Sequence, residues 1–262
     1  MESTDARRHE GLRFWLLAIG VFVAIETLDR AAIAAWAAST GTGFGAPLLL
    51  SMGFGLVEDA GTALVLGAPF LAGLHLLAPA WRRRAGRAAA HLLLLAMLCV
   101  LSFSEAGEMF FWNEFESRYN SIAVNYLVFP REVVGNIRES FNLGIYLPIV
   151  LLVACLLYAA LRRPLARALA AAAAPGLGLR MSGAAGLALA AGMAALHALP
   201  EDPFLDRTVN EVAHNGLHSL LRAGLTNDEK FDGLYATLPE AQARRLAREM
   251  VAQDNTRFLL PE

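Results

Sequence analysis

The chain has 262 residues, of which 56% are apolar and only 18% are charged. Because soluble domains carry about 25% charged residues, this composition excludes an ordinary soluble globular domain. The formal net charge of -2 at pH 7 says little about partners and gives no reason to expect nucleic acid.

The apolar residues come in blocks of about twenty, the length that crosses a hydrocarbon core about 30 Å thick. The first block follows a basic start, but its length and the lack of a small-residue cleavage site favour a retained helix over a signal peptide. Residues 48–61 are apolar but interrupted, which predicts a re-entrant or interfacial segment. The predicted fold is all-α, with five transmembrane helices at about 12–32, 61–81, 88–112, 143–161 and 181–199.

Basic residues are concentrated in three segments that share one side of the membrane if five helices alternate. By the positive-inside rule, that side is the cytoplasm. The N-terminus is then cytoplasmic, and both the loop 113–142 and the tail 201–262 are extracytoplasmic. We therefore expect a transmembrane domain at 1–200 and a helical juxtamembrane linker at 201–262. The basic residues are Arg7, Arg8 and Arg13, then Arg82, Arg83, Arg84 and Arg87, then Arg162, Arg163, Arg167 and Arg180.

This topology gathers five acidic residues near the outer helix ends, namely Asp29, Glu58, Asp59, Glu105 and Glu108. Ionisable residues at membrane depth are usually functional or paired. For Asp29, Glu58 and Asp59 the sequence favours a solvated interfacial position, with Asp29 able to pair locally with Arg30. Glu105 and Glu108 are three residues apart and lie deeper, so they are candidates for a structural or substrate-facing role.

The cysteines and histidines give weaker signals. Cys99 and Cys155 lie in different apolar runs, where a thiol behaves as a small buried hydrophobe, so neither a disulfide framework nor a metal cluster is implied. His214 and His218 are spaced i, i+4 and would share one face of a helix. With no third ligand evident, capping or packing is favoured over metal binding. Residues 239–254 have apolar side chains at helical spacing, which predicts an amphipathic helix.

Two segments resemble a known family. The first, NEFESRYNSIAVNYLVFPREVVGNIRESFN, is similar to the loop between the third and fourth helices of sulfatase-type phosphoglycerol transferases, the lipoteichoic acid synthase family. The second, NEVAHNGLHSLLRAGLTNDEKFDGLYATLP, resembles the juxtamembrane segment of that family. An Asp of the family pattern is Asn125 here. The matching positions are Phe115, Arg118, Tyr119, Asn120, 122–124, 126–128, 132–137, Glu139 and Ser140, then Asn210, Glu211, 215–217, Ser219, Asn227, Glu229 and Tyr235.

The resemblance implies a protein of the bacterial cytoplasmic (inner) membrane that acts beside an extracytoplasmic, alkaline-phosphatase-like domain. In the family that domain carries a Thr nucleophile and a divalent metal, typically manganese. This chain ends at Glu262, where the domain should begin, and no catalytic residue or metal ligand can be carried over. We therefore expect a membrane anchor and lipid-presenting domain from a truncated gene, a fragment or a split system. No cofactor is expected in the chain, and whether it is itself part of an enzyme stays open.

Membrane lipids such as phosphatidylglycerol, and a separate or fused catalytic domain, are the expected partners. Arginines of the outer loop can bind phosphate headgroups in bidentate fashion, or they can pair with Glu114, Glu116, Glu132 and Glu139 of the same loop. A stand-alone small transporter or channel subunit, or a degenerate protein, remains an alternative. The headgroup or domain-docking candidates are Glu105, Glu108, Arg118, Asn120, Tyr126, Arg131, Glu132, Asn136, Arg138, Asn210, Glu211 and Asn215.

Overall fold

The computed structural model describes residues 9–42, 45–128, 135, 137–138, 141–172, 178–226, 238 and 240–252. The chain divides into two compact units, Met1–Gly224 and Leu225–Glu262. All regular elements among the described residues are helices. The second unit contains α13 (Glu240–Val251), which lies within the run expected to form an amphipathic helix.

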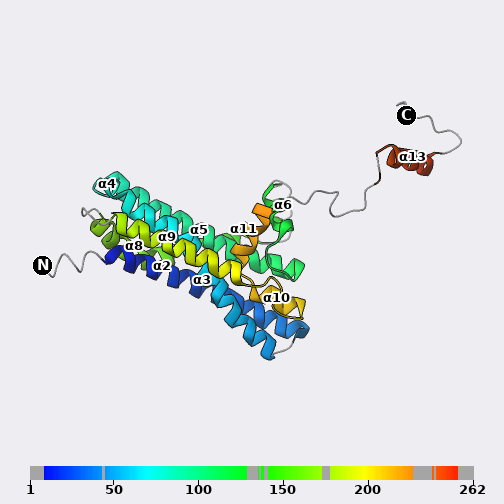
Figure 1. The fold of residues 1–262 in the computed structure, drawn as a ribbon, viewed down its shortest axis with the longest axis horizontal. Coiled ribbons are helices and arrows are strands. Elements are labelled where there is room, and N and C mark those ends of the chain that lie inside the picture. The colour runs from blue at the N-terminus through cyan, green and yellow to red at the C-terminus, as the bar shows by residue number, and fades with distance from the viewer. Residues whose placement is uncertain are drawn as a thin grey trace. The chain divides into compact units, whose positions relative to one another are not determined.

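Five helices of the first unit are long and apolar enough to cross a membrane, which confirms the predicted number (Figure 1). Four of them have 28 to 32 residues. Because about twenty residues cross the hydrocarbon core, each of these four helices is long enough to extend beyond the core by additional turns. The helices are α2 (Glu10–Ala37), α3 (Ala46–Leu76), α5 (Arg84–Phe115), α8 (Leu143–Ala172) and α9 (Gly178–Ala198).

Two boundaries differ from the sequence expectation. Residues 48–61, expected as a separate re-entrant or interfacial segment, form the first half of the continuous helix α3. Two glycines of this segment are sites of close packing: a Cβ on Gly55 would collide with the Arg30 guanidinium, and one on Gly61 would meet Leu196 of α9 at 3.0 Å. Residues 162–172, expected as a basic loop, continue α8 because Ala, Leu and Arg are strong helix formers.

The five long helices alternate in direction along the bundle (Figure 1). Helix α3 packs against α9 and α2, and α8 packs against α5 and α2. We call the end where α2 begins and α8 ends the basic end, and the opposite end, where α2 ends and α3 begins, the acidic end. Short helices α4 (Ala78–Trp81) at the basic end, and α6 (Ser121–Val128), α10 (Arg207–Ala213) and α11 (Gly216–Thr226) at the acidic end, complete the first unit.

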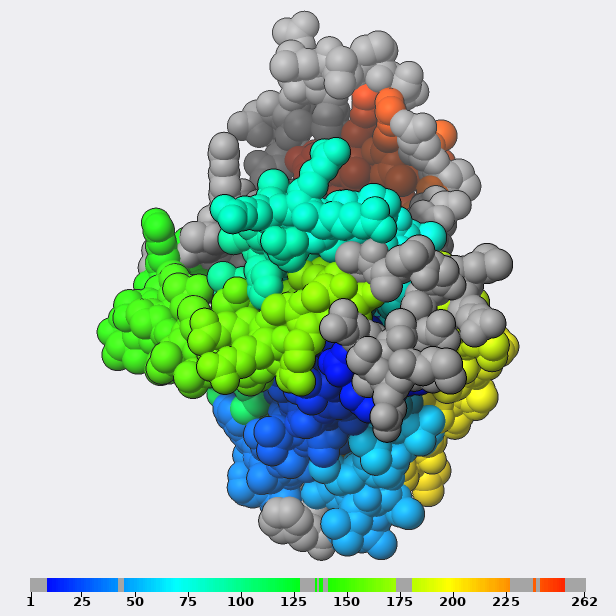
Figure 2. Space-filling view, turned by 90° about the vertical axis from the view of Figure 1, so that its left-hand side faces the viewer, coloured from blue at the N-terminus to red at the C-terminus, as the bar shows by residue number. Residues whose placement is uncertain are grey.

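The half of the bundle toward the basic end has an apolar core shared by α2, α3, α5 and α8. Figure 2 looks onto this end and shows α8 lying between α5 and α2. Large apolar side chains on the outer face of α8, such as Leu152 and Leu156, remain exposed, as expected for a surface that contacts lipid. The core residues are Phe14, Leu74, Ala90, Leu94, Leu98, Ala154, Leu161, Leu165, Ala168, Leu169 and Ala172.

Candidate functional site

Toward the acidic end an apolar cluster of α2, α3, α5 and α10 lies beside a group of mostly buried charged residues. We call this group the charged cluster; it comprises Glu26, Asp29 and Arg30 of α2, Glu58 and Asp59 of α3, Glu105 and Glu108 of α5, and Arg118 of the following loop. Seven of these eight residues are buried and Glu105 is half-buried. An unpaired charge in such a place is strongly disfavoured, so these side chains need partners.

Arg30 joins α2 to the end of α10. Its Nη1 donates to the carbonyl oxygens of Val212, Ala213 and His214 at 2.6, 2.6 and 2.8 Å. The last carbonyls of a helix have no partner within the helix and carry partial negative charge, which makes a guanidinium a suitable cap. Nη2 donates to Asp59 of α3 and to the Gly55 carbonyl. Arg30 therefore fixes α10 to α2 and α3 at once.

Arg118 makes the second junction. Its Nη1 donates to Asp29 Oδ2 at 2.6 Å and to Glu108 Oε1 at 2.7 Å. Its backbone N–H donates to the Glu211 carboxylate at 2.8 Å, which ties the loop after α5 to α10. Burial lowers the pKa of Arg118, but the carboxylates of Glu108 and Asp29 outweigh burial and raise this pKa above its ordinary value. The guanidinium is therefore a permanent positive charge inside the bundle.

A carboxylate of α3 holds two histidines of the juxtamembrane segment. His214 Nδ1 lies 3.1 Å from Glu58 Oε2, and His218 Nδ1 lies 2.5 Å from Glu58 Oε1. Burial lowers the pKa of His214, but the hydrogen bond and charge of Glu58 raise it above the ordinary value overall. The i, i+4 spacing thus allows both histidines to bind the same carboxylate. This agrees with the packing role that the sequence favoured over metal binding.

Two asparagines shape the juxtamembrane segment locally. Asn210 exchanges two hydrogen bonds of 2.7 Å with the backbone N–H and carbonyl of Phe204, closing the turn before α10. Asn215 accepts from the His218 N–H at 2.8 Å, as a residue that caps the start of α11 does, and donates to Asp59 at 2.9 Å. A Cβ added to Gly216 would collide with the Glu108 carboxylate, so the start of α11 lies directly on that side chain.

Tyr119 and α6 form an aromatic border beside the cluster. The Tyr119 hydroxyl donates to the Ser104 carbonyl at 2.9 Å, and burial followed by the carboxylates of Glu108 and Glu105 raises its pKa, so it stays protonated. Its ring lies 5.3 Å from that of Phe111. Phe115 bridges Phe111 and the half-exposed Tyr126 of α6, with ring centroids 4.5 and 6.2 Å apart. Such aromatic groups are typical of membrane–water interfaces.

Several carboxylate oxygens of the charged cluster are buried without a hydrogen-bond partner among the described residues. Oxygen atoms of Asp29, Glu105 and Glu108 all lie within 4.8 Å of one another. Within the described part of the chain, Glu26 Oε1 and Glu105 Oε2 are buried without a hydrogen-bond partner, as is Nη2 of Arg118. This unsatisfied acidic surface lies between α2 and α5.

Most predicted site residues come together at the acidic end. Arg118 joins Glu108 to Glu211, and Glu105 lies within 4.8 Å of Glu108. Asn215 bonds to Asp59 of the same charged cluster. Asn120 accepts from the Ile122 N–H at 2.9 Å at the start of α6. Arg138 is exposed, whereas Arg131, Glu132 and Asn136 lie outside the described residues.

Three expectations about these charges were wrong. Asp29, Glu58 and Asp59 are buried and paired rather than solvated, because α10 and α11 cover them. Asp29 pairs with Arg118, and Arg30 with Asp59, instead of with each other. Arg118 is 2% exposed and bonds to Asp29, Glu108 and Glu211, so it is not available to a lipid headgroup. Among the described residues, its ion pairs are with α2 and α5 and not with its own loop.

Glu26 and Arg30 were not selected from the sequence, although a signal was present. They are charged residues inside the first apolar block, and a charge at that depth is a candidate functional residue by default. Their spacing of i, i+4 with Asp29 between them puts all three on neighbouring positions of α2. The sequence did not indicate their partners, which for Arg30 lie 25 to 184 residues away along the chain.

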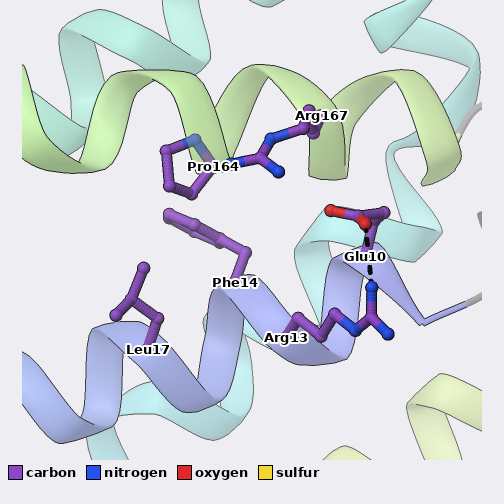
Figure 3. A pocket seen from close by; sticks show the side chains of 6 residues that line it. All are labelled: Glu10, Arg13, Phe14, Leu17, Pro164 and Arg167. Atoms are coloured by element: carbon purple, nitrogen blue, oxygen red, sulfur yellow. Dashed lines mark hydrogen bonds and ion pairs between the residues drawn. The ribbon is translucent and has the colours of Figure 1, made fainter.

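The basic end contains a small hollow between α2 and α8, with a volume of about 150 Å³ (Figure 3). Phe14 and Leu17 of α2 and Pro164 of α8 form its apolar wall. Its charged residues are Arg167, which is exposed, and Arg13, which pairs with Glu10 at 3.2 Å. An exposed pair of this kind contributes little to stability, so this end differs sharply from the charged cluster.

Comparison with known proteins found no matching family model, no matching curated protein and no matching solved structure.

Proposed function

We propose that this chain is the membrane module of a sulfatase-like phosphoglycerol transferase resembling lipoteichoic acid synthase. It holds its juxtamembrane segment, and through it a catalytic domain on the same or a separate polypeptide, over the outer leaflet of the bacterial cytoplasmic membrane. In this role the module supplies position and access to lipid, and the catalytic domain supplies the chemistry.

One observation carries the proposal. The two segments that resemble the family are distant in sequence but in contact in the fold: Arg118 of the first donates its backbone N–H to Glu211 of the second at 2.8 Å. Asn210 and Asn215, also family-pattern positions, fix the backbone around Glu211 through Phe204 and Asp59. The resembling residues therefore work together as one joint between the bundle and the segment that follows it.

The joint is rigid for a physical reason. Arg30 contacts three successive carbonyls at the end of α10, while Glu58 holds histidines on both sides of the turn between α10 and α11. Undocking α10 would leave the Nη1 donors of buried Arg30 without their three carbonyl acceptors, and a buried donor without an acceptor is disfavoured. Residues 207–224 are therefore held at a defined position on the bundle.

In this proposal, lipid headgroups reach the module at α6 and at the aromatic side chains beside it. Ile122, Tyr126 and Leu127 are exposed along this short helix, next to the aromatic border of Phe111, Phe115 and Tyr119. Such a surface suits the interfacial region where phosphatidylglycerol headgroups lie. Of the three arginines first considered for headgroup binding, Arg138 is exposed and retains this role in the proposal.

The transporter alternative uses the same acidic residues but does not account for their concentration at one end of the bundle. A transporter of cations needs polar groups along the whole path through the membrane. In the described residues the charged cluster gives way, toward the basic end, to the apolar core around Leu94, Leu98 and Leu165. The distribution of buried charge therefore favours a joint at one end of the bundle over a pathway through it.

The test is a transfer assay in liposomes that contain labelled phosphatidylglycerol and manganese. The full chain is compared alone and fused at its C-terminus to the catalytic domain of a lipoteichoic acid synthase. We expect transfer by the fusion only, and at least a tenfold loss in the fusion with Arg118→Met, whose joint is broken. Arg13→Met, which removes an exposed arginine at the basic end, is the matched control and should keep full transfer.

Each fusion is also assayed on a soluble substrate that the catalytic domain hydrolyses without a membrane. Equal hydrolysis by all fusions shows that the catalytic domain is intact, so that a loss of lipid transfer reflects position. Transfer by the chain alone, or transfer by the Arg118→Met fusion equal to that of the unmodified fusion, would overturn the proposal.

A further inference from the structure

Two pairs of carboxylates face each other between α2 and α5. Glu26 and Asp29 are three residues apart on α2, and Glu105 and Glu108 are three apart on α5, so each pair shares one helix face. The two helices are in contact. Di-metal carboxylate proteins of the four-helix type place acidic side chains from neighbouring helices into a bundle core in a comparable way.

The geometry suits a single cation. Oxygen atoms of Asp29, Glu105 and Glu108 all lie within 4.8 Å of one another. Hard divalent cations bind oxygen at about 2.0 to 2.6 Å, so two ligands on opposite sides of one ion are about 4 to 5 Å apart. All three carboxylates can therefore contact one ion without a change in the helix backbones.

A separate observation indicates that a ligand belongs there. Glu26 is 1% exposed, and its Oε1 is buried with no hydrogen-bond partner among the described residues. Glu26 lies three residues before Asp29 on α2, so its side chain is on the same helix face as the Asp29 carboxylate. Oε2 of Glu105 is likewise buried and without a partner in the described chain. Ionised carboxylate oxygens buried without a donor are strongly disfavoured.

The charges point to the same conclusion. The four carboxylates face one guanidinium, that of Arg118, which already uses its Nη1 for Asp29 and Glu108. The second nearby guanidinium, Arg30, is committed to Asp59 and to the end of α10. Ionised, the four carboxylates and Arg118 therefore leave three negative charges without a counterion, and a divalent cation compensates most of this excess.

We propose that Asp29, Glu105 and Glu108, with Glu26 as a fourth carboxylate, form a binding site for a hard divalent cation of the Mg²⁺, Mn²⁺ or Ca²⁺ class. Carboxylate oxygens alone, without sulfur or imidazole, select this class. The site is a property of the bundle and does not depend on the proposed transferase role.

The first test uses the full chain, purified in detergent and stripped of metal with a chelator. Manganese binding is followed by electron paramagnetic resonance and by metal analysis after dialysis, and thermal unfolding is measured with added Mg²⁺, Mn²⁺ or Ca²⁺. We expect about one ion per chain and a melting temperature that rises with ion concentration, since a ligand of the folded state stabilises it. Absence of binding at millimolar ion, or stabilisation by Na⁺ alone, would overturn the assignment.

The second test replaces Glu105 by glutamine. Glu105→Gln keeps the shape of the side chain and removes one negative charge, so binding should weaken at least tenfold while the metal-free chain melts at the same or a higher temperature. A merely structural Glu105 would instead lower the metal-free melting temperature. Glu114→Gln, at an exposed position of the same helix, is the control and should bind as the wild type does.

Glu26→Gln provides an independent variant if the first does not fold, with the same weakening expected. Binding by either folded variant that equals that of the wild type contradicts the proposal.

Discussion

At the basic end, α2, α3, α5 and α8 meet through leucine, alanine and phenylalanine side chains, and arginines such as Arg162 and Arg163 lie on the outside. At the acidic end the arrangement is reversed, because Arg30 and Arg118 lie inside, surrounded by carboxylates. Apolar packing joins the helices at both ends, and Val212 of α10 packs into the apolar cluster of the acidic end. The buried charges at that end add hydrogen bonds and ion pairs that hold the juxtamembrane segment to the bundle. Docking thus combines apolar packing with buried charge.

The largest effect is expected from Arg30→Met, which removes an ion pair and the cap of α10. Leaving Asp59 buried without its guanidinium should destabilise the docked segment by about 3 to 5 kcal/mol. Limited proteolysis of residues 201–224 in nanodiscs measures this as faster cleavage. Arg13→Met, an arginine paired only at the surface, should change cleavage little. Equal cleavage of the two variants would contradict the difference between a buried arginine at the acidic end and an exposed arginine at the basic end.

Leu165→Ala tests the opposite end. Leu165 is 0% exposed in the apolar core. In lipid the transfer of the side chain contributes little, so the cavity should cost about 2 kcal/mol, the low end of the range for such changes. We expect a lower melting temperature of the bundle with unchanged cleavage of residues 201–224. Leu156→Ala, on the lipid-facing side of α8, is the control and should melt close to the wild type.

Gly216→Ala places a methyl group against the Glu108 carboxylate and should cost about 1 to 2 kcal/mol through overpacking. The same change at Gly224, in the same helix but with open space around it, should be neutral or slightly stabilising because alanine favours helix. Chemical unfolding of the two variants gives the comparison. A loss of stability with Gly224→Ala equal to that with Gly216→Ala would show that α11 does not rest on Glu108.

The smallest effect concerns pH. Since the pKa of folded His214 lies above its ordinary value of about 6.5, its contribution to docking is complete below that value and is lost as pH rises through the folded pKa. Proteolysis of residues 201–224 should therefore accelerate as the pH rises above about 6.5. Glu58→Gln removes the negative partner and should flatten this dependence. An unchanged pH dependence in that variant would contradict the role of Glu58.

Sequence reasoning found the helices because a bilayer imposes length and apolarity on every span, and those requirements are local. It also selected Glu108, as an acidic residue deep in an apolar span, and Arg118, Glu211 and Asn215, which belong to the two segments that resemble a known family. It did not find the pairing of Arg30 with Asp59 and α10, or of Glu58 with His214. Those contacts depend on which helix faces pack against each other. The order and direction of the spans, which the sequence does predict, do not determine that.

Hydrogen exchange of the backbone amides of α10 and α11, measured on the full chain in nanodiscs, tests the docking most directly. The structure predicts strong protection of residues 207–224 in the wild type and its loss in Arg30→Met, with unchanged exchange in α13. Fast exchange of 207–224 in the wild type, or equal protection in Arg30→Met, would contradict a juxtamembrane segment held by buried charge.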